Sequence, residues 1–300
     1  MRLISYRLNG EIGVGAMVDE SSAVALSEVA PNLPRDLKQI LEMDDGLERV
    51  RAAVDGRMAN IALDDIALDP VILDPHAIWA LALNFQMHIQ ETSLTTSAEH
   101  PQIFLRMPAS QVGHGQAMVC PRPEVAKTYD YEGELAVIIG RGGRYIDESD
   151  ALDHVAGYAC YNEGSVREFQ NHNRQFGLGK NFEKSGSFGP WMVTADEFGN
   201  PRKHTVTTRL NGVEKQRCGF DEMLFSVEQV IRYLSTGYSL RPGDVIVMGT
   251  PGALPPGPDY VPGPQDSDRI PGRTHMKPGD VVEVEISGIG SLVNPIIASD

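Results

Sequence analysis

Short apolar stretches, some of them alternating with polar residues, recur along the chain after residue 75. Eight of these stretches predict β-strands, at 78–83, 102–106, 133–140, 155–161, 191–194, 205–210, 244–249 and 280–286. Glycine (30 residues) and proline (20 residues) are spread throughout, as is typical of a β-rich chain with many turns. We therefore expect a mainly β domain over residues 74–300.

The N-terminal part has a different pattern. Residues 1–30 predict short strands, with turns at two dipeptides, Asn9-Gly10 and Asp19-Glu20. Apolar residues at helical spacing predict a helix over 34–58, and 62–75 resembles a linker or extended arm. The sequence therefore predicts a small α+β domain over 1–73, followed by the larger domain.

The C-terminal part contains a helix candidate and a repeated turn. Residues 225–235 predict a helix that is capped by Ser226 and carries Glu228 in its first turn. The segments RPGDVIVMGT and KPGDVVEVEI share a Pro-Gly turn followed by an aspartate that begins a strand. Residues 253–273 are rich in proline and glycine, so we expect an extended loop there.

The charge and composition exclude several classes of function. The net charge of -15 disfavours binding to nucleic acid or to anionic membranes, because both need clustered Lys and Arg. There is no signal-peptide pattern and no apolar run long enough to cross a bilayer. The three cysteines, Cys120, Cys160 and Cys218, lack CxxC spacing, so we expect reduced thiols and a cytoplasmic location.

Three glutamates are candidates for holding a metal ion. Glu132 and Glu134 are two apart on a predicted strand, so their side chains share one face and repel each other unless a cation lies between them. A hard divalent cation with oxygen ligands would resolve that repulsion. Glu163 follows the strand candidate 155–161 and could complete the site. Taken alone, each has a simpler interpretation: a solvent-facing acidic strand, or a loop carboxylate.

Lys180, His88 and Glu91 are candidates for the chemistry itself. Lys180 lies in GKNF and could contact a substrate carboxylate or a developing oxyanion. His88 and Glu91 are three apart, which places them side by side on a helical turn, where a carboxylate can orient an imidazole base. The simpler interpretations are a surface lysine and a partly buried histidine.

Other catalytic patterns are missing from the sequence. The histidines show no HExxH spacing, and the GRGGR run at 140–144 is not a dinucleotide-binding fingerprint. There is no phosphate-binding GxxxxGK[ST] loop, and Ser187 in GSFGP is not a GxSxG nucleophile. Carboxylate–metal chemistry is therefore the strongest candidate.

Several motifs, in order, resemble the fumarylacetoacetate hydrolase family over residues 76–298. They are LNFQMHIQE, IFLRMP, DYEGELAVIIG, GYACYNEGSVREFQ, GKNFEKSGSFGPW, LNGVEKQ, PGDVIVMGTPGAL and KPGDVVEVEISGIGSLVNPI. The resemblance implies a mixed β-rich α+β fold: a fumarylacetoacetate hydrolase-like β-roll with a small N-terminal domain. It also implies a homodimer.

The resemblance assigns roles to residues of this chain. Glu132 and Glu134 match metal ligands for Mg²⁺ or Mn²⁺, and Glu163 matches a third ligand that is usually aspartate. Lys180 matches the active-site lysine, and His88 and Glu91 match a water-activating pair on a lid helix. The residues expected to contact the substrate are Asn84, Arg106, Arg167, Gln170 and Thr250. Arg106 stands where many relatives carry lysine.

The implied activity is metal-dependent cleavage of a C–C bond in a small diketo (2-oxo) acid, such as an acylpyruvate, by hydrolysis. The His88/Glu91 pair favours hydrolysis, because a water-activating base is needed there. Decarboxylation of oxaloacetate and isomerisation use the same enolate site, so both remain alternatives. A non-catalytic binding protein stabilised by a metal is the alternative from another class.

Overall fold

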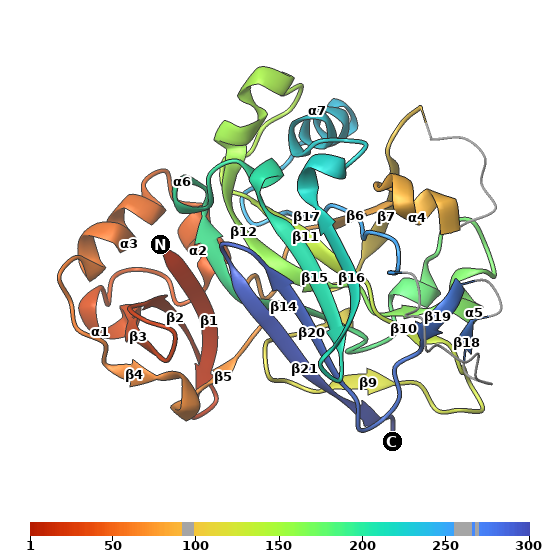
Figure 1. Cartoon of the computed structure of the whole chain (residues 1–300). Helices are drawn as coiled ribbons and strands as arrows, with labels where there is room; N and C mark the ends of the chain where they lie inside the picture. The colour runs from red at the N-terminus through yellow and green to blue at the C-terminus, as the bar shows by residue number, and fades with distance from the viewer. Residues whose placement is uncertain (92–98, 255–265, 268–269) are drawn as a thin grey trace.

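The structure is a computed structural model that describes residues 1–91, 99–254, 266–267 and 270–300. A 12-stranded sheet forms the centre of the described part (Figure 1). Its strands run in the order β4-β3-β2-β1-β14-β12-β11-β17-β6-β7, with β5 beside β1 and β8 beside β14. Their bounds are β1 Arg2–Leu8, β2 Glu11–Met17, β3 Ser22–Ala25, β4 Ile61–Ala62, β5 Ala67–Leu68, β6 Ile78–Ala82, β7 Gln102–Arg106, β8 Gln111–Val112, β11 Gly133–Ile139, β12 Val155–Asn162, β14 Gly186–Thr194 and β17 Val245–Val247.

A five-stranded sheet, in the order β16-β15-β20-β21-β9, packs beside the large one (Figure 1). Its strands are β9 Met118–Cys120, β15 Thr205–Leu210, β16 Val213–Gly219, β20 Val281–Ile286 and β21 Gly290–Ala298. Two small pairs complete the described strands: β10 Tyr129–Asp130 with β13 Ser165–Val166, and β18 Asp266–Ser267 with β19 Ile270–Thr274. The mixed, β-rich fold expected from the sequence is thus confirmed.

The helices are short and lie around the sheets. The α-helices are α1 Leu26–Val29, α2 Leu37–Leu41, α3 Gly46–Val54, α4 Gln86–Glu91, α5 Arg167–Gln170, α6 Ala195–Phe198 and α7 Val227–Gly237. Short 3₁₀ segments, η1 to η6, are Leu63–Asp65, Pro108–Ser110, Glu148–His154, Leu178–Lys180, Pro201–Lys203 and Phe220–Glu222. As expected, α7 begins after Ser226, whose side chain accepts from the backbone N–H of Gln229 in a capping box.

All eight predicted strand positions hold strands, although 191–194 is only the second half of β14. The prediction of one helix over 34–58 was wrong, because the chain breaks it into α2 and α3. A Cβ atom at Gly46 would lie 1.9 Å from the carbonyl oxygen of Ile40, so the two helices meet at a backbone contact that only glycine permits.

Two loop predictions are also corrected. Within the predicted linker 62–75, β5 pairs with β1, so this segment is partly built into the sheet. The end of the predicted loop 253–273 forms β18 and β19, while 255–265 and 268–269 lie outside the described residues. Whether the chain divides into domains at residue 73 stays a prediction.

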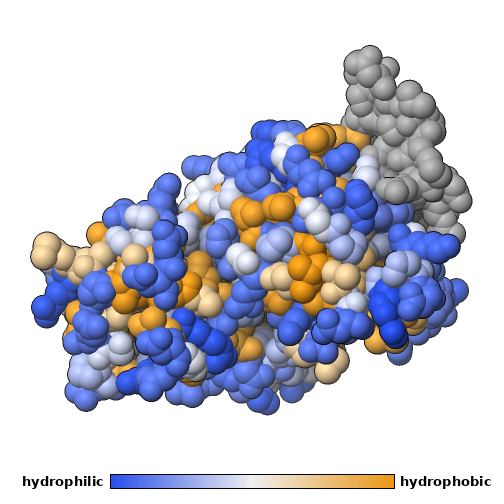
Figure 2. Space-filling view, turned by 90° about the horizontal axis from the view of Figure 1, so that it is seen from below, coloured by the Kyte–Doolittle hydropathy of each residue, from blue (hydrophilic) through white to orange (hydrophobic). Residues whose placement is uncertain are grey.

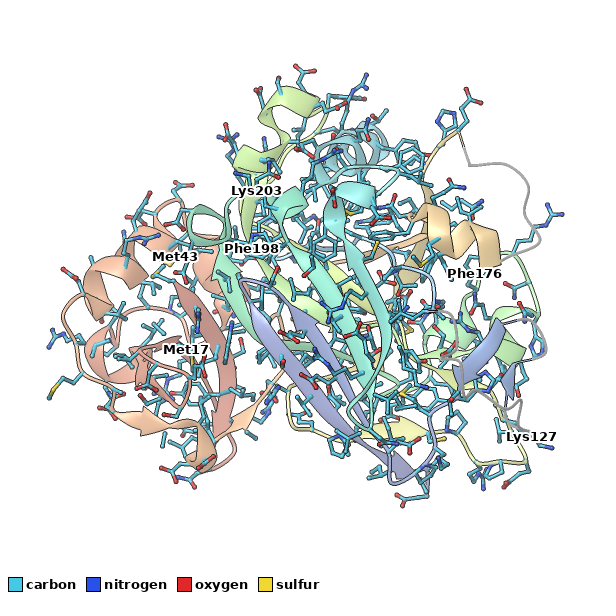
Figure 3. The ribbon with its side chains drawn as sticks, viewed as in Figure 1. Met17, Met43, Lys127, Phe176, Phe198 and Lys203 are labelled. Carbon is cyan, nitrogen blue, oxygen red and sulfur yellow. The ribbon has the colours of Figure 1, made fainter. Side chains whose placement is uncertain are left out.

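The large sheet has a hydrophobic core on each face. On one face Leu135 and Val137 of β11 pack with residues of the five-stranded sheet and of α7. On the other face Ala136 and Ile138 pack with residues of α1, α2 and α3. At the edge of the first core the ring of Phe198, labelled in Figure 3, stacks 3.9 Å from the ring of His204. Because side chains alternate along β11, successive residues pack into the cores on opposite faces of the sheet.

The repeated Pro-Gly-Asp segments form the same turn. Asp244 accepts a hydrogen bond from the backbone N–H of Arg241 at 2.8 Å, and Asp280 accepts one from Lys277 at 2.9 Å. The glycine before each aspartate has a positive φ, +82° at Gly243 and +93° at Gly279. The first of these turns begins β17.

The three cysteines are buried, and none forms a disulfide in the structure. On the face seen in Figure 2, hydrophobic patches are interrupted by hydrophilic ones. In the part of the chain that the structure covers, no helix is long and apolar enough to cross a membrane.

Candidate active site

Two neighbouring strands bring the three predicted metal ligands together. Glu132 lies just before β11 and Glu134 lies within it, while Glu163 follows directly after β12. The strands are antiparallel neighbours, and the N–H of Glu163 donates to the carbonyl oxygen of Glu132 at 2.8 Å. Alternation places all three side chains on the face that carries Ala136 and Ile138.

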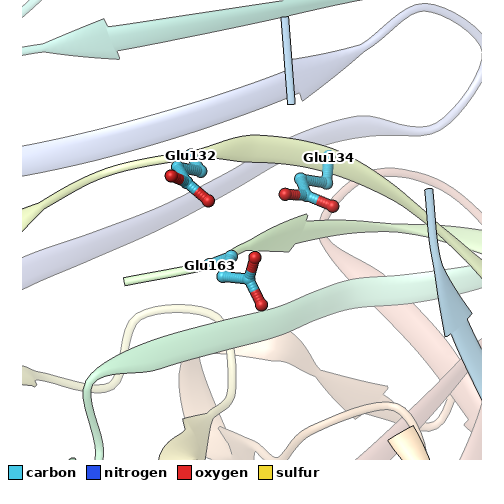
Figure 4. A group of neighbouring side chains, drawn as sticks. All are labelled: Glu132, Glu134 and Glu163. Atoms are coloured by element: carbon cyan, nitrogen blue, oxygen red, sulfur yellow. The ribbon is translucent and has the colours of Figure 1, made fainter. Parts of the chain in front are cut away.

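The three carboxylates converge on one buried point. One oxygen from each of Glu132, Glu134 and Glu163 lies within 4.8 Å of the other two, and Figure 4 shows the carboxyl groups turned toward one another. Their exposed fractions are 3%, 0% and 1%. The family resemblance implied this meeting of residues that are about thirty positions apart, which their spacing alone had left open.

The donor set fits a divalent cation. Oε1 of Glu134 and Oε1 of Glu163 are buried without a hydrogen-bond partner among the described residues. The pKa of Glu134 is raised well above its usual value by burial, by Glu163 and by Glu132, and Lys180 offsets this only in part. Buried carboxylate oxygens that accept no hydrogen bond suit a hard ion such as Mg²⁺ or Mn²⁺.

Lys180 supplies one positive charge to this cluster. Its Nζ donates to Oε2 of Glu132 at 2.7 Å and to Oε2 of Glu163 at 3.0 Å. The lysine is 3% exposed and lies in the 3₁₀ turn η4, where a Cβ atom at Gly179 would come within 2.1 Å of the backbone nitrogen of Gln170. The glycine therefore lets this turn approach α5 closely.

Aromatic rings line the lysine. Nζ of Lys180 lies 5.2 Å from the ring of Phe104, and the ring of Phe176 packs edge-on against Phe104 at 5.7 Å. Phe176 is labelled in Figure 3. An apolar surround of this kind strengthens the ammonium's interaction with the carboxylates.

Arg167 brings a second cation, from the start of α5. Its Nη2 lies 2.5 Å from Oε1 of Glu132, and its Nη1 donates to Oε1 of Gln170 at 2.6 Å. Burial lowers the pKa of Arg167, but the charges of Glu132 and Asp130 outweigh it, so the pKa is raised overall. The Arg167 side chain is 21% exposed, against 4% for the Lys180 side chain.

Arg106 also reaches the cluster, but its side chain is fully buried. It donates to the hydroxyls of Ser110 and Ser185 and to the carbonyl oxygen of Gly164, at 3.2 to 3.3 Å. Its Nη1 lies 3.4 Å from Oε1 of Glu163. All of these contacts are with other groups of the protein. A contact between Arg106 and the substrate stays a prediction.

Asn84 and Thr250 make buried contacts with the protein. The side chain of Asn84 donates to the carbonyl oxygens of Phe225 and Met248 and accepts from the N–H of Phe225. The hydroxyl of Thr250 donates to the carbonyl oxygen of Gly133 and accepts from Gln216. Both residues fix the strand ends around Glu134.

His88 and Glu91 lie on one short helix, α4, as the family resemblance implied. A Cβ atom at Gly252 would lie 2.7 Å from Cγ of Met87, so α4 packs against the segment that follows β17. The side chain of Glu91 lies outside the described part of the structure. The pairing of His88 with Glu91 therefore stays a prediction.

Two further residues belong to the site. Asp130 pairs with Arg167, and Gln216 is fully buried and joins the N–H of Gly133 to Thr250. Asp130 could have been found, because it continues the two-residue spacing of Glu132 and Glu134 in DYEGE. No local pattern marks Gln216, since it lies in a strand of the other sheet.

Fold and site together define a mainly β enzyme with a buried carboxylate cluster beside a lysine. Residues 77–297 match the sequence model described as fumarylacetoacetate (FAA) hydrolase C-terminal. The chain belongs to the fumarylacetoacetate hydrolase family.

Named relatives span several activities. The chain is 31% identical over 304 residues to a protein of Xenopus laevis named oxaloacetate tautomerase fahd2, mitochondrial, covering 99% of this chain and 90% of that one. The solved fumarylacetoacetate hydrolase from Exiguobacterium antarcticum is 28% identical, with a TM-score of 0.81 and full coverage of both chains. A maleylpyruvate hydrolase from Sphingobium sp. SYK-6, solved with manganese(II) and pyruvate, shares the fold at 21% identity, a TM-score of 0.78 and full coverage of both chains.

Proposed function

We propose that this protein is a divalent-metal-dependent enzyme that interconverts the enol and keto forms of a small 2-oxo acid, with oxaloacetate as substrate. The observation that carries the proposal is the buried cluster of Glu132, Glu134 and Glu163 with Lys180 between two of its members. The oxaloacetate tautomerase name of a relative that covers nearly the whole chain supports the reaction.

Glu132, Glu134 and Glu163 would hold Mg²⁺ or Mn²⁺, which when bound supplies the positive charge that stabilises negative charge on the oxygens of an enolate. Manganese in a protein of the same fold supports this choice of ion. The ion would also explain how a chain with a net charge of -15 attracts an acidic substrate.

The chain's own residues would bind the substrate and control its protons. Tautomerisation moves one proton between the carbon next to the oxo group and the oxo oxygen. Lys180 is buried at the cluster, where its ammonium can donate a hydrogen bond to the oxo oxygen as negative charge develops there. Arg167, as the more exposed cation, would bind the substrate carboxylate.

Hydrolytic C–C cleavage is the second candidate. It is supported by the position of His88 on α4 and by the name of the Exiguobacterium relative. Hydrolysis needs a group that activates water, which is the role proposed for His88 with Glu91. We place it second because it depends on Glu91, whereas the enolate site consists of described residues.

The location and assembly are also proposals. We propose a homodimer with a small 2-oxo acid as its ligand on the basis of the family resemblance, and a cytoplasmic location on the basis of the three cysteines, which lack CxxC spacing. The Xenopus laevis relative is named as mitochondrial, so the compartment is best tested by fractionation of the source cells. Light scattering on the purified protein tests the dimer.

The activity test starts from chelator-treated protein that is titrated with Mg²⁺ or Mn²⁺. Enol loss from oxaloacetate, CO₂ release and acylpyruvate cleavage are measured side by side, with metal and buffer alone as the blank. We expect the first reaction to be metal-dependent. If chelation lowers only the melting temperature and no 2-oxo acid reacts, the protein is a binding protein instead.

Lys180→Met tests the cluster directly. Loss of a donor that stabilises the developing charge should lower kcat by about two to three decades. The matched control is Lys184→Met, an exposed lysine four residues further on, whose kcat should equal that of the wild type. Equal kcat in both variants would remove Lys180 from the mechanism.

A further inference from the structure

Asp130 lies beside the metal cluster without belonging to it. It continues the alternation of Glu132 and Glu134 and is 1% exposed, yet it is not a member of the carboxylate group found among the described residues. Its Oδ2 accepts from Nε of Arg167 at 2.9 Å and from Nη2 at 2.7 Å. This aspartate therefore faces the guanidinium of Arg167.

Both oxygens of Asp130 are used. While Oδ2 holds Arg167, Oδ1 accepts from the backbone N–H of Tyr131 at 2.9 Å. The carboxylate is thus fixed by its own strand and presents one oxygen, Oδ2, to the guanidinium. An amide in its place has one acceptor oxygen, so an asparagine side chain at this position could not serve both donors.

The backbone around Arg167 is held by other contacts. β10 pairs with β13 through Asp130 and Ser165, and the N–H of Arg167 donates to the carbonyl oxygen of Thr128 at 3.0 Å. Glu168 accepts from the N–H of Lys127 at 2.7 Å and from the hydroxyl of Thr128. The start of α5 is therefore held without the Asp130 side chain. That side chain accepts from the guanidinium of Arg167 and from the N–H of Tyr131, and so it orients the guanidinium.

We propose that Asp130 is a positioning residue, which sets the guanidinium of Arg167 beside Glu132 so that it receives the carboxylate of the 2-oxo acid. This inference rests on the proposed function. Asp130 is buried while the Arg167 side chain is 21% exposed, so the arginine is the member of the pair that reaches solvent and ligand. Two charge-assisted bonds, from Nε and Nη2 to the same oxygen of Asp130, hold that edge of the guanidinium in place.

Asp130→Asn is the main test, measured on the full chain loaded with Mn²⁺. The KM for oxaloacetate and the Kd for pyruvate should rise about ten- to a hundred-fold, as expected for a weakened bond to a charged group. The Kd for Mn²⁺ and kcat should change less than about three-fold. Arg167→Lys should raise KM similarly, and the double variant should add little to either.

Glu168→Gln is the matched control, because it alters the same segment without touching the guanidinium. Its KM should stay near the wild-type value. An equal rise in KM in Glu168→Gln would mean that Asp130 acts only on folding of the segment, and loss of Mn²⁺ binding in Asp130→Asn would make it a metal ligand. Either outcome overturns the proposal.

A measurement without turnover separates this inference from the proposed function. Solvent exchange of the Arg167 Nε–H, followed by ¹⁵N NMR, should be slow in the wild type and at least ten-fold faster in Asp130→Asn. Unchanged exchange refutes positioning even if the enzyme is active. Faster exchange in a chain that turns over no 2-oxo acid supports the positioning of Arg167 and refutes the proposed function. If Asp130→Asn does not fold, Asp130→Glu is measured with the same readouts, because it keeps the charge but moves the carboxylate by one methylene; unchanged KM and unchanged Nε–H exchange in that variant refute positioning.

Discussion

Glu134 is a proposed metal ligand whose burial among other carboxylates costs folding free energy. It is completely buried, it lies among two other carboxylates, and its Oε1 has no hydrogen-bond partner among the residues described. Its folded-state pKa lies above the ordinary value of 4.5. A carboxyl group with a raised folded pKa stabilises the protein fully below its unfolded pKa. That contribution is lost as pH rises toward the folded value.

We therefore expect Glu134→Gln to raise the stability of the metal-free protein and to abolish metal binding. In chelator, the variant should match the wild type near pH 4 and exceed its melting temperature at about pH 8, because glutamine has no proton to lose. With Mn²⁺ present the order should reverse, since only the wild type gains free energy from the ion. Thermal melts across pH test this; a variant that melts lower than the wild type in chelator at both pH values contradicts it.

Residue types and spacing predicted part of the site, but not the contacts between its elements. Alternation predicted that Glu132 and Glu134 share a face, and the same rule reaches Asp130. It could not reveal that Asp130 binds Arg167, which comes from another element. Nor could it reveal the burial of Arg106, because exposure is decided by what packs over a strand end. Cross-chain partners of this kind need the folded structure.

At the scale of elements, the end of β17 holds Glu134 through Gly249. The N–H of Gly249 donates to Oε2 of Glu134 at 2.6 Å, and its φ is +87°. An added Cβ would lie 2.8 Å from Cβ of Asn84, a residue already fixed by bonds to Phe225 and Met248. The strand end therefore needs glycine at the point where it meets the cluster, because its backbone conformation and its close approach to Asn84 leave no room for a side chain.

Gly249→Ala should destabilise the protein by about 2 to 3 kcal/mol, of which roughly 1 to 2 come from the left-handed backbone and the rest from the clash. Its Kd for Mn²⁺ should rise about ten-fold as the N–H shifts away from Glu134. Gly279→Ala is the control, with a φ of +93° and no atom within 4 Å of the added Cβ. It should lose only the backbone part and bind Mn²⁺ normally in titration calorimetry.

Strands and helices were predicted correctly where the local sequence has one clear pattern. Buried strands such as β11 and β12 have mainly apolar sequences, and α7 has its cap. The helix over 34–58 failed because spacing does not show the backbone contact at Gly46. The first half of β14 was missed because Gly186–Pro190 resembles a turn, although β12 pairs with it there. Tertiary pairing overrides local preference in such segments.

At the scale of the whole molecule, the N-terminal strands continue the main sheet. β1 pairs with β14 through Arg2 and Leu3, which joins residues 1–73 to the catalytic part (Figure 1). Both hydrophobic cores draw on each part: Ile4 lies in the same cluster as Leu135, and Leu3 in the same cluster as Ala136. If residues 1–73 separated from the rest of the chain, both parts would expose apolar surface and unpaired strand edges.

We therefore expect residues 1–73 to unfold together with the rest of the chain, although the sequence suggests a separate domain. In native-state hydrogen exchange with mass spectrometry, peptides from β1 and β2 should show the same opening free energy as peptides from β11 and β12, within about 1 kcal/mol. Peptides from the exposed strand β16 should exchange faster and serve as the internal reference for local opening. The same ranking should hold with and without Mn²⁺. An ion at the carboxylates raises the free energy of global opening by its binding free energy. This increase is the same for every peptide that exchanges only through global opening. Earlier opening of β1 and β2 would mean that the β1–β14 junction is weaker than the cores on either side of it, and that the boundary near residue 73 separates two units of unequal stability.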